Sequence, residues 1–415
     1  MTARQHGIAI IGGGSAGWWL AYALVRRGIR CTVIDTHPFA AYASTRNQGW
    51  LHSGAFYAIF GDNQTAYFCQ RGYHLMRFFE PSAIHSNVPC FYLFEHEGEL
   101  EHTLLRCNEL GIRAKPIPMQ ELKDRELILH QTSLAYAAEV WDCPIDTSRL
   151  LERVAHEAHV GGAHYRIVPS LDTIIPTWDA GTWRVRLDHG PALRCNAIVL
   201  ACGTYIPEML ARLIPGQVPD FERTKIPVLV MKGPVANSML ITPYASDGPN
   251  LVPFFGEECS GATICLRATD QEIADPSDTA LPPDHLQRHL ASLSEYYGGL
   301  KSILSRGNHI TAHFYTCQKL RLRQADLSER RSHILLTHPP VPGAPESIFT
   351  FYPGKFTTAP IAAKLCAEQL QNFLADPTRP RAGKLPPPAI ARQKYYDPSK
   401  YDLIVDQEGL SFRPS

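Results

Sequence analysis

Three glycines and one carboxylate near the start of the chain have the spacing that binds the pyrophosphate and ribose of a dinucleotide. Gly12, Gly14 and Gly17 occupy the glycine positions of a G-x-G-x-x-G pattern. The first glycine allows a tight turn, the second lets backbone approach a pyrophosphate, and the third lets a helix pack close to a strand. Asp35 follows about 20 residues later, where a ribose hydroxyl needs an acceptor. The predicted dinucleotide site consists of Gly12, Gly14, Ser15, Ala16, Gly17, Asp35 and Thr36.

The elements that must hold these residues are indicated by the same stretch. Residues 8–11 form a short apolar run, which is typical of a buried parallel strand. Residues 15–27 predict a helix whose N-terminal amides face the phosphate, and Gly28 ends it. Residues 29–34 predict a second strand that ends at Asp35. An ordinary strand-turn-helix with glycines used for packing is the alternative, but the register of all these features favours the nucleotide site.

Length and composition describe an ordinary folded protein. The chain has 415 residues, of which 45% are hydrophobic and 19% charged, and this length exceeds one simple core, so we expect two domains. Lys plus Arg and Asp plus Glu are equal at 40 each, which gives no bulk attraction to nucleic acid. The 11 cysteines are scattered without a C-x-x-C pair, which indicates reduced thiols and no metal site.

The sequence also bears on location. No charged-then-apolar leader precedes Ile8, and no apolar run approaches the ~20 residues of a membrane-spanning helix. We therefore expect no removable leader and no integral membrane segment. A cytoplasmic location is the default expectation.

Downstream of the dinucleotide motif, periodicity predicts further elements. Residues 64–80 have the pattern of a helix with an apolar stripe that should face the core, made of Tyr67, Phe68, Leu75, Phe78 and Phe79. Residues 197–203 form another buried strand ending in glycine, which could return to the nucleotide sheet. We also predict a strand over 171–175, a helix over 282–304 and a final helix over 360–374.

Two further stretches, with the dinucleotide motif, resemble the D-amino-acid oxidase superfamily of FAD-dependent oxidoreductases. The resemblance is nearest to the branch with L-2-hydroxyglutarate dehydrogenase and FAD-dependent glycerol-3-phosphate dehydrogenase. Residues 44–57 (STRNQGWLHSGAFY) are similar to the family's R/H-N-S-G-x-I-H-S/G-G-x-x-Y, and residues 354–358 (GKFTT) to G-G-K-L-T-T. Gln48 and Cys202 depart from the family pattern, and the substrate-domain stretches match no single member, which leaves the substrate open.

The resemblance implies an FAD cofactor and an α/β fold (α+β overall) with two parts. A Rossmann-like FAD-binding domain is expected over 1–85, 145–225 and 310–375. A discontinuous, mainly antiparallel β-sheet substrate domain is expected over 86–144 and 226–309, followed by a Pro-rich C-terminal tail over 376–415. Further expected cofactor contacts are Arg46, Asn47, Gln48, Gly49, Leu51, His52, Leu171, Ala201, Cys202, Gly203, Gly354, Lys355, Phe356, Thr357 and Thr358.

The family's chemistry suggests roles for a few polar residues. Such enzymes remove a hydride from a C–H bond bearing a hydroxyl or amine and pass it to flavin N5. His52 is expected over the flavin as general base, or alternatively as a group that only positions the flavin. Lys355, Arg321, Arg323 and Arg267 are candidate anchors for a small anionic substrate, such as a 2-hydroxy acid, an amino acid or a polyol phosphate. Each arginine has a solvated surface charge as its alternative role, and the electron acceptor is left between oxygen and a quinone.

Other classes of protein fit the sequence less well. An FAD monooxygenase using NAD(P)H would carry a later G-D segment, which is not found over 203–223. A reductase with two nucleotide sites would need a second glycine motif, and an NAD-dependent dehydrogenase would not explain residues 46–54. The monooxygenase and a non-catalytic flavoprotein that serves as a binding partner remain the alternatives.

Overall fold

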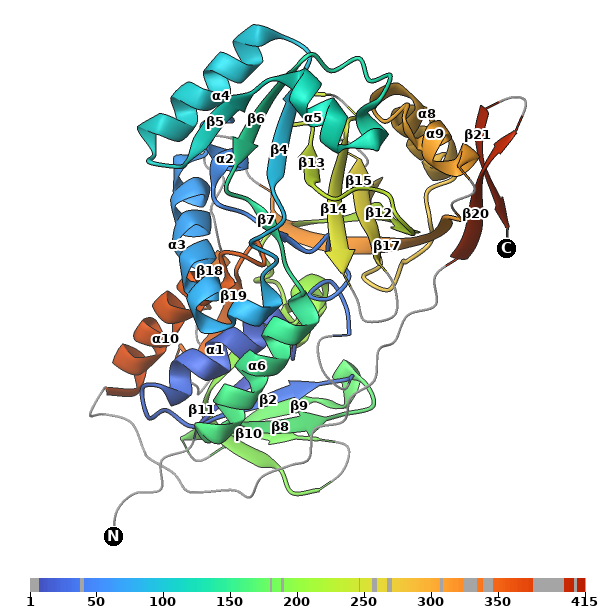
Figure 1. Cartoon of the computed structure of the whole chain (residues 1–415). Coiled ribbons are helices and arrows are strands. Elements are labelled where there is room, and N and C mark those ends of the chain that lie inside the picture. The colour runs from blue at the N-terminus through green and yellow to red at the C-terminus, as the bar shows by residue number, and fades with distance from the viewer. Residues whose placement is uncertain are drawn as a thin grey trace. The chain divides into compact units, whose positions relative to one another are not determined.

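The chain is divided into two compact units, each assembled from separate segments. In the computed structural model (Figure 1) the first unit takes residues 1–45, 148–223 and 319–395, and the second takes 46–147, 224–318 and 396–415. The residues described are 7–37, 41–179, 181–187, 190–245, 247–255, 260–266, 271–306, 309–323, 334–338, 346–375, 399–406 and 409–414. The mixed α/β class predicted from the sequence is confirmed.

The first unit is organised on a sheet that has eight strands among the described residues. Five neighbouring strands run parallel in the order β19 (Ile348–Tyr352), β11 (Leu193–Leu200), β1 (Gly7–Ile11), β2 (Cys31–Asp35) and β8 (His164–Ile167). The remaining strands are antiparallel additions: β18 (Ile334–Thr337) beside β19, and β9 (Ile175–Asp179) with β10 (Thr182–Arg186) beside β11. The parallel block is the Rossmann-like sheet that the glycine motif predicted.

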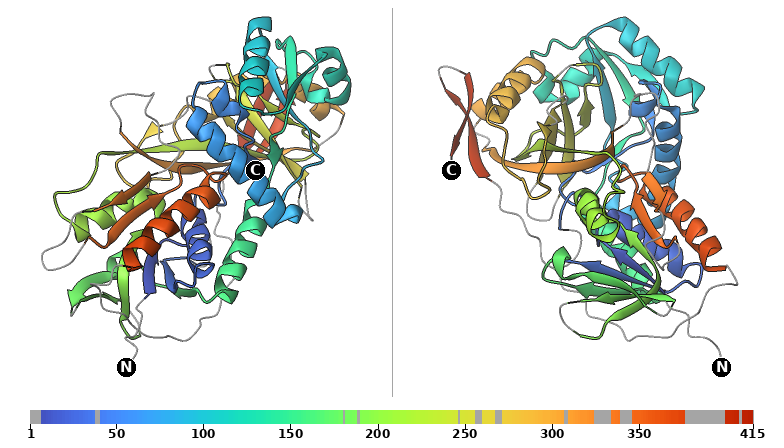
Figure 2. Two further views of the ribbon diagram at one scale, coloured as in Figure 1. Left: turned by 90° about the vertical axis from the view of Figure 1, so that its left-hand side faces the viewer. Right: turned by 180° about the vertical axis from the view of Figure 1, so that it is seen from behind.

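Helix α1 (Ser15–Val25) is buried along nearly all its length. Its sequence is apolar all round, and Trp18, Trp19 and Leu20 are almost fully buried. A helix that is apolar on every side needs neighbours on more than one face, and α1 packs against β2 and against α10 (Ala359–Ala375), which lies beside it in Figure 2. Two other helices belong to this unit, α6 (Thr147–Val160) and α7 (Ile206–Leu213).

The second unit contains a sheet that has eleven strands among the described residues. Its neighbours run antiparallel at β12–β15–β14–β13 and at β4–β6–β5, and parallel where β13 meets β4. A separate two-stranded ladder joins β3 (Trp50–Leu51) to β7 (Cys143–Pro144). The large sheet consists of β21 (Gly409–Pro414), β20 (Ser399–Asp406), β17 (Thr311–Leu322), β12 (Phe221–Lys232), β15 (Ser260–Leu266), β14 (Pro249–Phe255), β13 (Met239–Ile241), β4 (Cys90–Phe94), β6 (Tyr136–Val140) and β5 (Ala114–Ile117), with β16 (Gln271–Glu272) beside β12.

Helices of the second unit pack on this sheet around two apolar clusters. One cluster joins Phe91, Leu251 and Phe314 of the sheet to Leu293 and Tyr297. The other surrounds Tyr92 and Phe94 and continues into the short helix α2. The helices are α2 (Ala55–Ala58), α3 (Asn63–Phe79), α4 (Glu97–Glu109), α5 (Met119–Arg125), α8 (His285–Tyr296) and α9 (Leu300–Ser305).

Two predicted elements are wrong. The helix predicted over 282–304 is divided into α8 and α9, because a Cβ at Gly299 would lie 1.9 Å from the carbonyl oxygen of Leu127, so the chain makes a close approach there instead of continuing the helix. The strand predicted over 171–175 begins as the short turn η3 (Leu171–Thr173), and only residue 175 onward is β.

The apolar stripe predicted on the helix at 64–80 is also wrong, although the helix itself is present as α3. Tyr67 and Phe78 are 51% and 89% exposed, while Cys69, Tyr73 and Met76 form the buried face. The buried face of α3 is formed mainly by small residues that alternate with the aromatic ones. The largest apolar side chains of a helix are therefore not always the buried ones.

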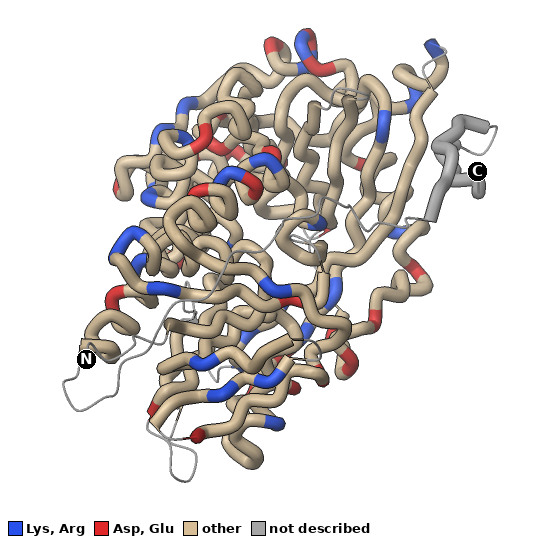
Figure 3. Tube along the Cα trace, turned by 90° about the horizontal axis from the view of Figure 1, so that it is seen from below, with Lys and Arg blue, Asp and Glu red and all other residues tan. Residues whose placement is uncertain are grey.

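The charges are mixed along the chain. Figure 3 shows Lys and Arg interspersed with Asp and Glu on the described trace, as the equal totals suggest. Among the described helices, none is both long and apolar enough to cross a bilayer.

Candidate cofactor and active site

The glycine loop between β1 and α1 requires glycine for steric reasons. Gly12 has φ +118°, and a Cβ there would lie 2.4 Å from the carbonyl oxygen of Ala201. A Cβ at Gly17 would lie 1.9 Å from the carbonyl oxygen of Gly12. Both distances are far below any real contact, so only glycine allows the strand, the loop and the helix to come this close.

The N-terminus of α1 offers hydrogen-bond donors. Gly14 is its N-cap and supplies no side chain to the helix amides. The Ser15 amide donates to Ser44 Oγ at 2.8 Å. The Ser15 hydroxyl is buried and has no hydrogen-bond partner in the part of the chain that the structure describes. A helix N-terminus with a buried, unsatisfied hydroxyl fits a phosphate group.

Asp35 joins the end of β2 to the glycine loop. One carboxylate oxygen accepts from the Gly13 amide, and the other accepts from the amides of Thr36 at 2.6 Å and His37 at 3.3 Å. Burial raises the pKa of Asp35, while these amides act in the opposite direction. The carboxylate therefore orders the loop that it would share with a ribose.

The end of strand β11 lies against the same glycine loop. The amide of Ala201 donates to the Ile11 carbonyl at 2.8 Å, and Gly203 adopts φ +59° where β11 turns into the short η4 (Gly203–Tyr205). Cys202 lies between them, and burial raises the pKa of its thiol well above the usual range. Burial therefore disfavours the thiolate form that a nucleophilic cysteine needs.

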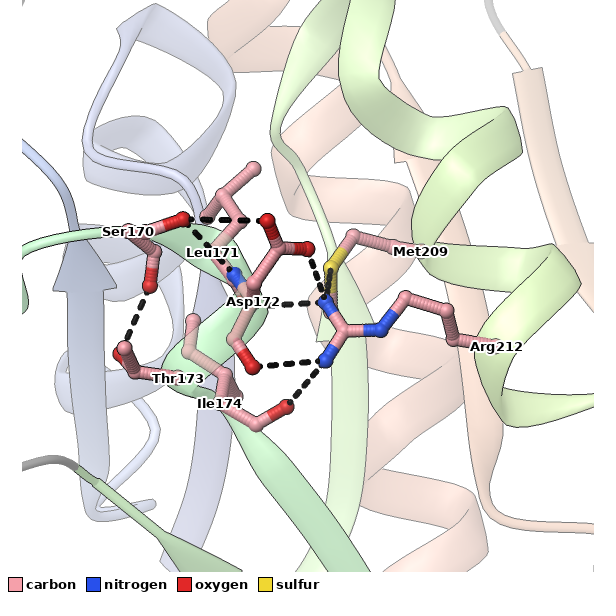
Figure 4. Close-up of polar contacts among 7 residues, drawn as sticks. All are labelled: Ser170, Leu171, Asp172, Thr173, Ile174, Met209 and Arg212. Carbon is pink, nitrogen blue, oxygen red and sulfur yellow. Dashed lines mark hydrogen bonds and ion pairs between the residues drawn. The ribbon is translucent and has the colours of Figure 1, made fainter.

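Leu171 lies in the η3 turn that follows β8, and this turn is held by an arginine that the sequence did not single out. Figure 4 shows the guanidinium of Arg212, from α7, pointing at the turn. It donates to the carbonyl oxygens of Leu171 and Asp172 at 2.9 Å each and of Ile174 at 3.2 Å, and to the Asp172 carboxylate at 3.1 Å. A single fork-shaped side chain thus satisfies the exposed carbonyls of a short turn.

The stretch from Gly354 to Thr358 is a tight turn between β19 and α10. Gly354 has φ +73°, and Lys355 donates its amide to the Pro353 carbonyl at 2.8 Å. Thr358 is fully buried, and its hydroxyl bonds to the carbonyls of Pro353 and Lys355 (3.0 Å for the second). Thr358 therefore shapes the turn. Phe356 lies half-buried and Thr357 buried in the same turn.

These five groups share one property. Each one lies at the end of, or a few residues after, a strand of the parallel block: β1, β2, β8, β11 and β19. Because parallel strands end at one edge of a sheet, the structure brings together Gly12–Gly17, Asp35–Thr36, Leu171, Ala201–Gly203 and Gly354–Thr358. The carboxyl edge of such a sheet is where nucleotides bind.

The remaining predicted cofactor residues lie in the second unit and are ordered by it. Asn47 Oδ1 accepts from the Gly49 amide at 2.8 Å, and Gly49 has φ +68°. The carbonyl of Gln48 accepts from Thr263 Oγ1 at 2.9 Å. Arg46 precedes this turn and is half-buried.

The strand β3 then carries the chain to His52. Leu51 is fully buried and pairs with Cys143 of β7. The half-buried imidazole of His52 stacks on the Trp50 indole, with ring centroids 4.1 Å apart and 32° between planes, and lies 5.2 Å from the Tyr57 ring. A titratable ring is thereby held on an aromatic support.

The residues predicted to bind an anionic substrate differ in exposure and in their neighbouring charges. Arg321 is the penultimate residue of β17 and is half-buried, whereas Arg323 follows the strand and its guanidinium lies 3.4 Å from the Asp220 carboxylate. Lys355 is half-buried in the turn before α10. Arg267 lies outside the described residues.

The comparison with known proteins identifies the family. A model of the family described as FAD dependent oxidoreductase (DAO) matches residues 7–369. The chain belongs to this family. Its cofactor is FAD, and its class of activity is oxidoreductase, as the resemblance implied.

Relatives with known roles match parts of this flavoenzyme. One subunit of the anaerobic glycerol-3-phosphate dehydrogenase of Escherichia coli (strain K12) is 32% identical over 171 residues, 39% of this chain and 31% of that protein. The similarly named protein of Haloferax volcanii is 24% identical over 298 residues, 66% of this chain and 48% of that protein. The matches thus span about a third to a half of these longer relatives.

Solved structures share the fold along nearly the whole flavoenzyme. Glycine oxidase from Geobacillus kaustophilus has a TM-score of 0.68 at 16% identity and covers 94% of this chain and 99% of its own. L-alpha-glycerophosphate oxidase from Mycoplasma pneumoniae, solved with FAD bound, has a TM-score of 0.67 at 15% identity and covers 92% and 99%. At these identities the likeness establishes the fold alone.

Proposed function

We propose that this flavoenzyme is an oxidase or dehydrogenase that takes a hydride from a C–H bond bearing a hydroxyl or amine of a small anionic substrate. The observation that carries the proposal is the placement of His52. Its imidazole is half-buried, stacked on Trp50 and held on a segment that is bonded to the rest of its unit on both sides. A rigid imidazole is suited to accept a proton near neutral pH.

The first unit would hold the cofactor through the carboxyl edge of its parallel strands. The N-terminal amides of α1 and the Ser15 hydroxyl would bind the pyrophosphate, and Asp35 would accept from the ribose. Bound FAD would supply the two-electron acceptor for the hydride. Ser44, whose hydroxyl already bonds to the first amide of α1, would orient that phosphate site.

The remaining candidate residues would accept a proton from the substrate and bind its anionic group. As the substrate carbon loses its hydride, its hydroxyl or ammonium group loses one proton to the His52 imidazole, which leaves a carbonyl or an iminium ion, respectively. Lys355 and Arg321 are the cations we assign to the anionic group of the substrate. Arg323 is a weaker candidate because it already faces the Asp220 carboxylate.

The deciding experiment is anaerobic bleaching of the flavin by matched pairs of compounds. Glycerol 3-phosphate is compared with glycerol, glycine with glycinamide, and 2-hydroxyglutarate with its diamide. We expect one compound that carries a phosphate or carboxylate to bleach the flavin while its partner without that group does not. Bleaching by NAD(P)H alone would favour the monooxygenase alternative, and a flavin that none of these compounds reduces would overturn the proposal.

A further inference from the structure

A carboxylate that the sequence did not single out lies in the core of the second unit. Asp142, between β6 and β7, is 2% exposed. Its Oδ2 accepts from Trp50 Nε1 at 2.7 Å and from Tyr92 Oη at 2.8 Å. Its Oδ1 accepts from the amide of Ser53 at 2.6 Å and from the Ser53 hydroxyl. Two segments distant in sequence, residues 50–53 and the strand of Tyr92, therefore converge on one side chain.

This burial is costly and needs an explanation. In the described part of the chain, Asp142 forms hydrogen bonds but no ion pair with lysine or arginine. Desolvation raises the pKa of its carboxyl, and the donors from Ser53, Tyr92 and Trp50 only partly oppose this. A buried carboxylate without a cation is a poor device for stability alone, because an apolar core of the same shape would avoid the desolvation.

Three of the four donors to Asp142 belong to the residues on either side of His52. Trp50 lies two residues before His52 and supports its ring, while Ser53 follows it directly. The hydrogen bond from the Trp50 indole holds the ring on which the imidazole stacks. The hydrogen bond from the Ser53 amide holds the backbone immediately after His52. We propose that Asp142 is a positioning residue that sets the orientation of the His52 imidazole; this proposal rests on the proposed role of His52.

The donor pattern makes a nearly isosteric test possible. Each oxygen of Asp142 faces an N–H group that can only donate, namely the Trp50 indole on Oδ2 and the Ser53 amide on Oδ1. In Asp142→Asn one oxygen becomes an NH2 group, which must point at one of these two donors. The variant keeps the volume of the side chain but repels a neighbour of His52.

The test uses the flavin-loaded full chain and observes His52 directly. The Trp50 indole N–H and the His52 imidazole are followed by NMR and assigned with Trp50→Phe and His52→Gln. In Asp142→Asn we expect retained FAD, displaced Trp50 and His52 signals, and a changed pH profile. With a reducing substrate, kcat should fall by about 10- to 100-fold while KM changes little, as is typical of a misplaced catalytic group.

Tyr92→Phe is the matched control, because it removes one donor to the same carboxylate from a strand that does not contain His52. It should lower the melting temperature but leave the His52 signal and the pH profile in place. If Asp142→Asn does not fold, Trp50→Phe removes the indole donor, and Ser53→Ala removes the hydroxyl donor while keeping the Ser53 amide; each should displace the His52 signal.

Two results would overturn the positioning role: His52 signals unchanged in Asp142→Asn or in both single-donor variants, or equal displacement in Tyr92→Phe. A different result would refute the proposed function. If His52→Gln keeps full turnover while Asp142→Asn still displaces the imidazole, His52 is positioned by Asp142 but is not the base.

Discussion

The two units hold their candidate functional residues by different means. In the first unit the cofactor edge is made of backbone: strand ends, helix amides and glycines whose missing Cβ atoms permit contacts such as Gly17 against Gly12. In the second unit the His52 segment is held by buried side chains, above all Asp142. A backbone site leaves no room for an added atom at its closest contacts, such as Gly12 and Gly17, whereas a side-chain site depends on the right donors and acceptors. The predictions below test this difference.

The largest effect should come from adding one methyl group to the backbone site. In Gly17→Ala the Cβ would lie 1.9 Å from the Gly12 carbonyl oxygen, so the loop or the helix must move. We expect protein without flavin or without a stable fold, measured by the ratio of flavin to protein absorbance. Gly98→Ala in α4 is the control, because its Cβ meets nothing within 4 Å. Full flavin content in Gly17→Ala would contradict this expectation.

The His52 segment should behave in the opposite way. His52→Gln is expected to keep its flavin but to lower kcat by about 100-fold or more, because a positioned general base contributes on this scale. Flavin content and turnover are measured on the same preparation. The exposed His130→Gln serves as a control and should turn over normally. Turnover at the normal rate in His52→Gln would remove its catalytic role.

Acid should weaken the second unit through a buried histidine on α8. Burial lowers the pKa of His289 from 6.5 to about 4. The unfolded chain takes up a proton below pH 6.5 while the folded chain resists until about pH 4, so stability is lost as the pH falls across this range. At about pH 5 the loss should be roughly 2 kcal/mol.

His289→Gln should flatten that pH dependence, which is measured by denaturant unfolding and by hydrogen exchange of α8. Exchange in α1 of the first unit provides the internal reference. His130→Gln, which changes an exposed histidine, should leave the slope as it is. An equal slope in His289→Gln and the unaltered protein would show that another group causes the acid sensitivity.

The smallest effect tests whether the backbone site also uses side-chain support. Arg212→Lys loses the forked hydrogen bonds to the carbonyls of Leu171, Asp172 and Ile174. We expect a stability loss of about 1–2 kcal/mol and FAD affinity lower by severalfold, roughly the value of one or two net hydrogen bonds. Arg194→Lys, in an exposed pair 3.8 Å from Asp179, should change neither quantity. Equal flavin affinity in both variants would separate Arg212 from the cofactor site.

Sequence patterns succeeded where structure is local. The strand, glycine loop and helix at residues 7–25 were predictable because their glycine spacing and apolar pattern lie within one short stretch of chain, and the final helix followed from its own periodicity. The break between α8 and α9 was not predictable, because its cause is the carbonyl of Leu127, far away in sequence. The exposed Phe78 was missed because size alone does not decide which face of α3 is buried.

The candidate functional residues show the same difference between local and distant contacts. Ser44 was within a stretch that resembles the family, but nothing local revealed that its hydroxyl bonds to Ser15, 29 residues away. Asp142 had no local signal at all, since its partners lie 92, 89 and 50 residues distant. A buried carboxylate is recognised only when its surroundings are known.

The sequence by itself determined the nucleotide motif, because glycine spacing and hydrophobic periodicity act over one or two turns of chain, and the resemblance of residues 44–57 and 354–358 to known motifs determined the family and its class of fold. The tertiary structure alone decided that five strand ends meet at one edge of a sheet and that Asp142 supports the residues around His52. The physical reason is that strand order and hydrogen bonds between distant residues depend on packing, which short-range patterns do not encode.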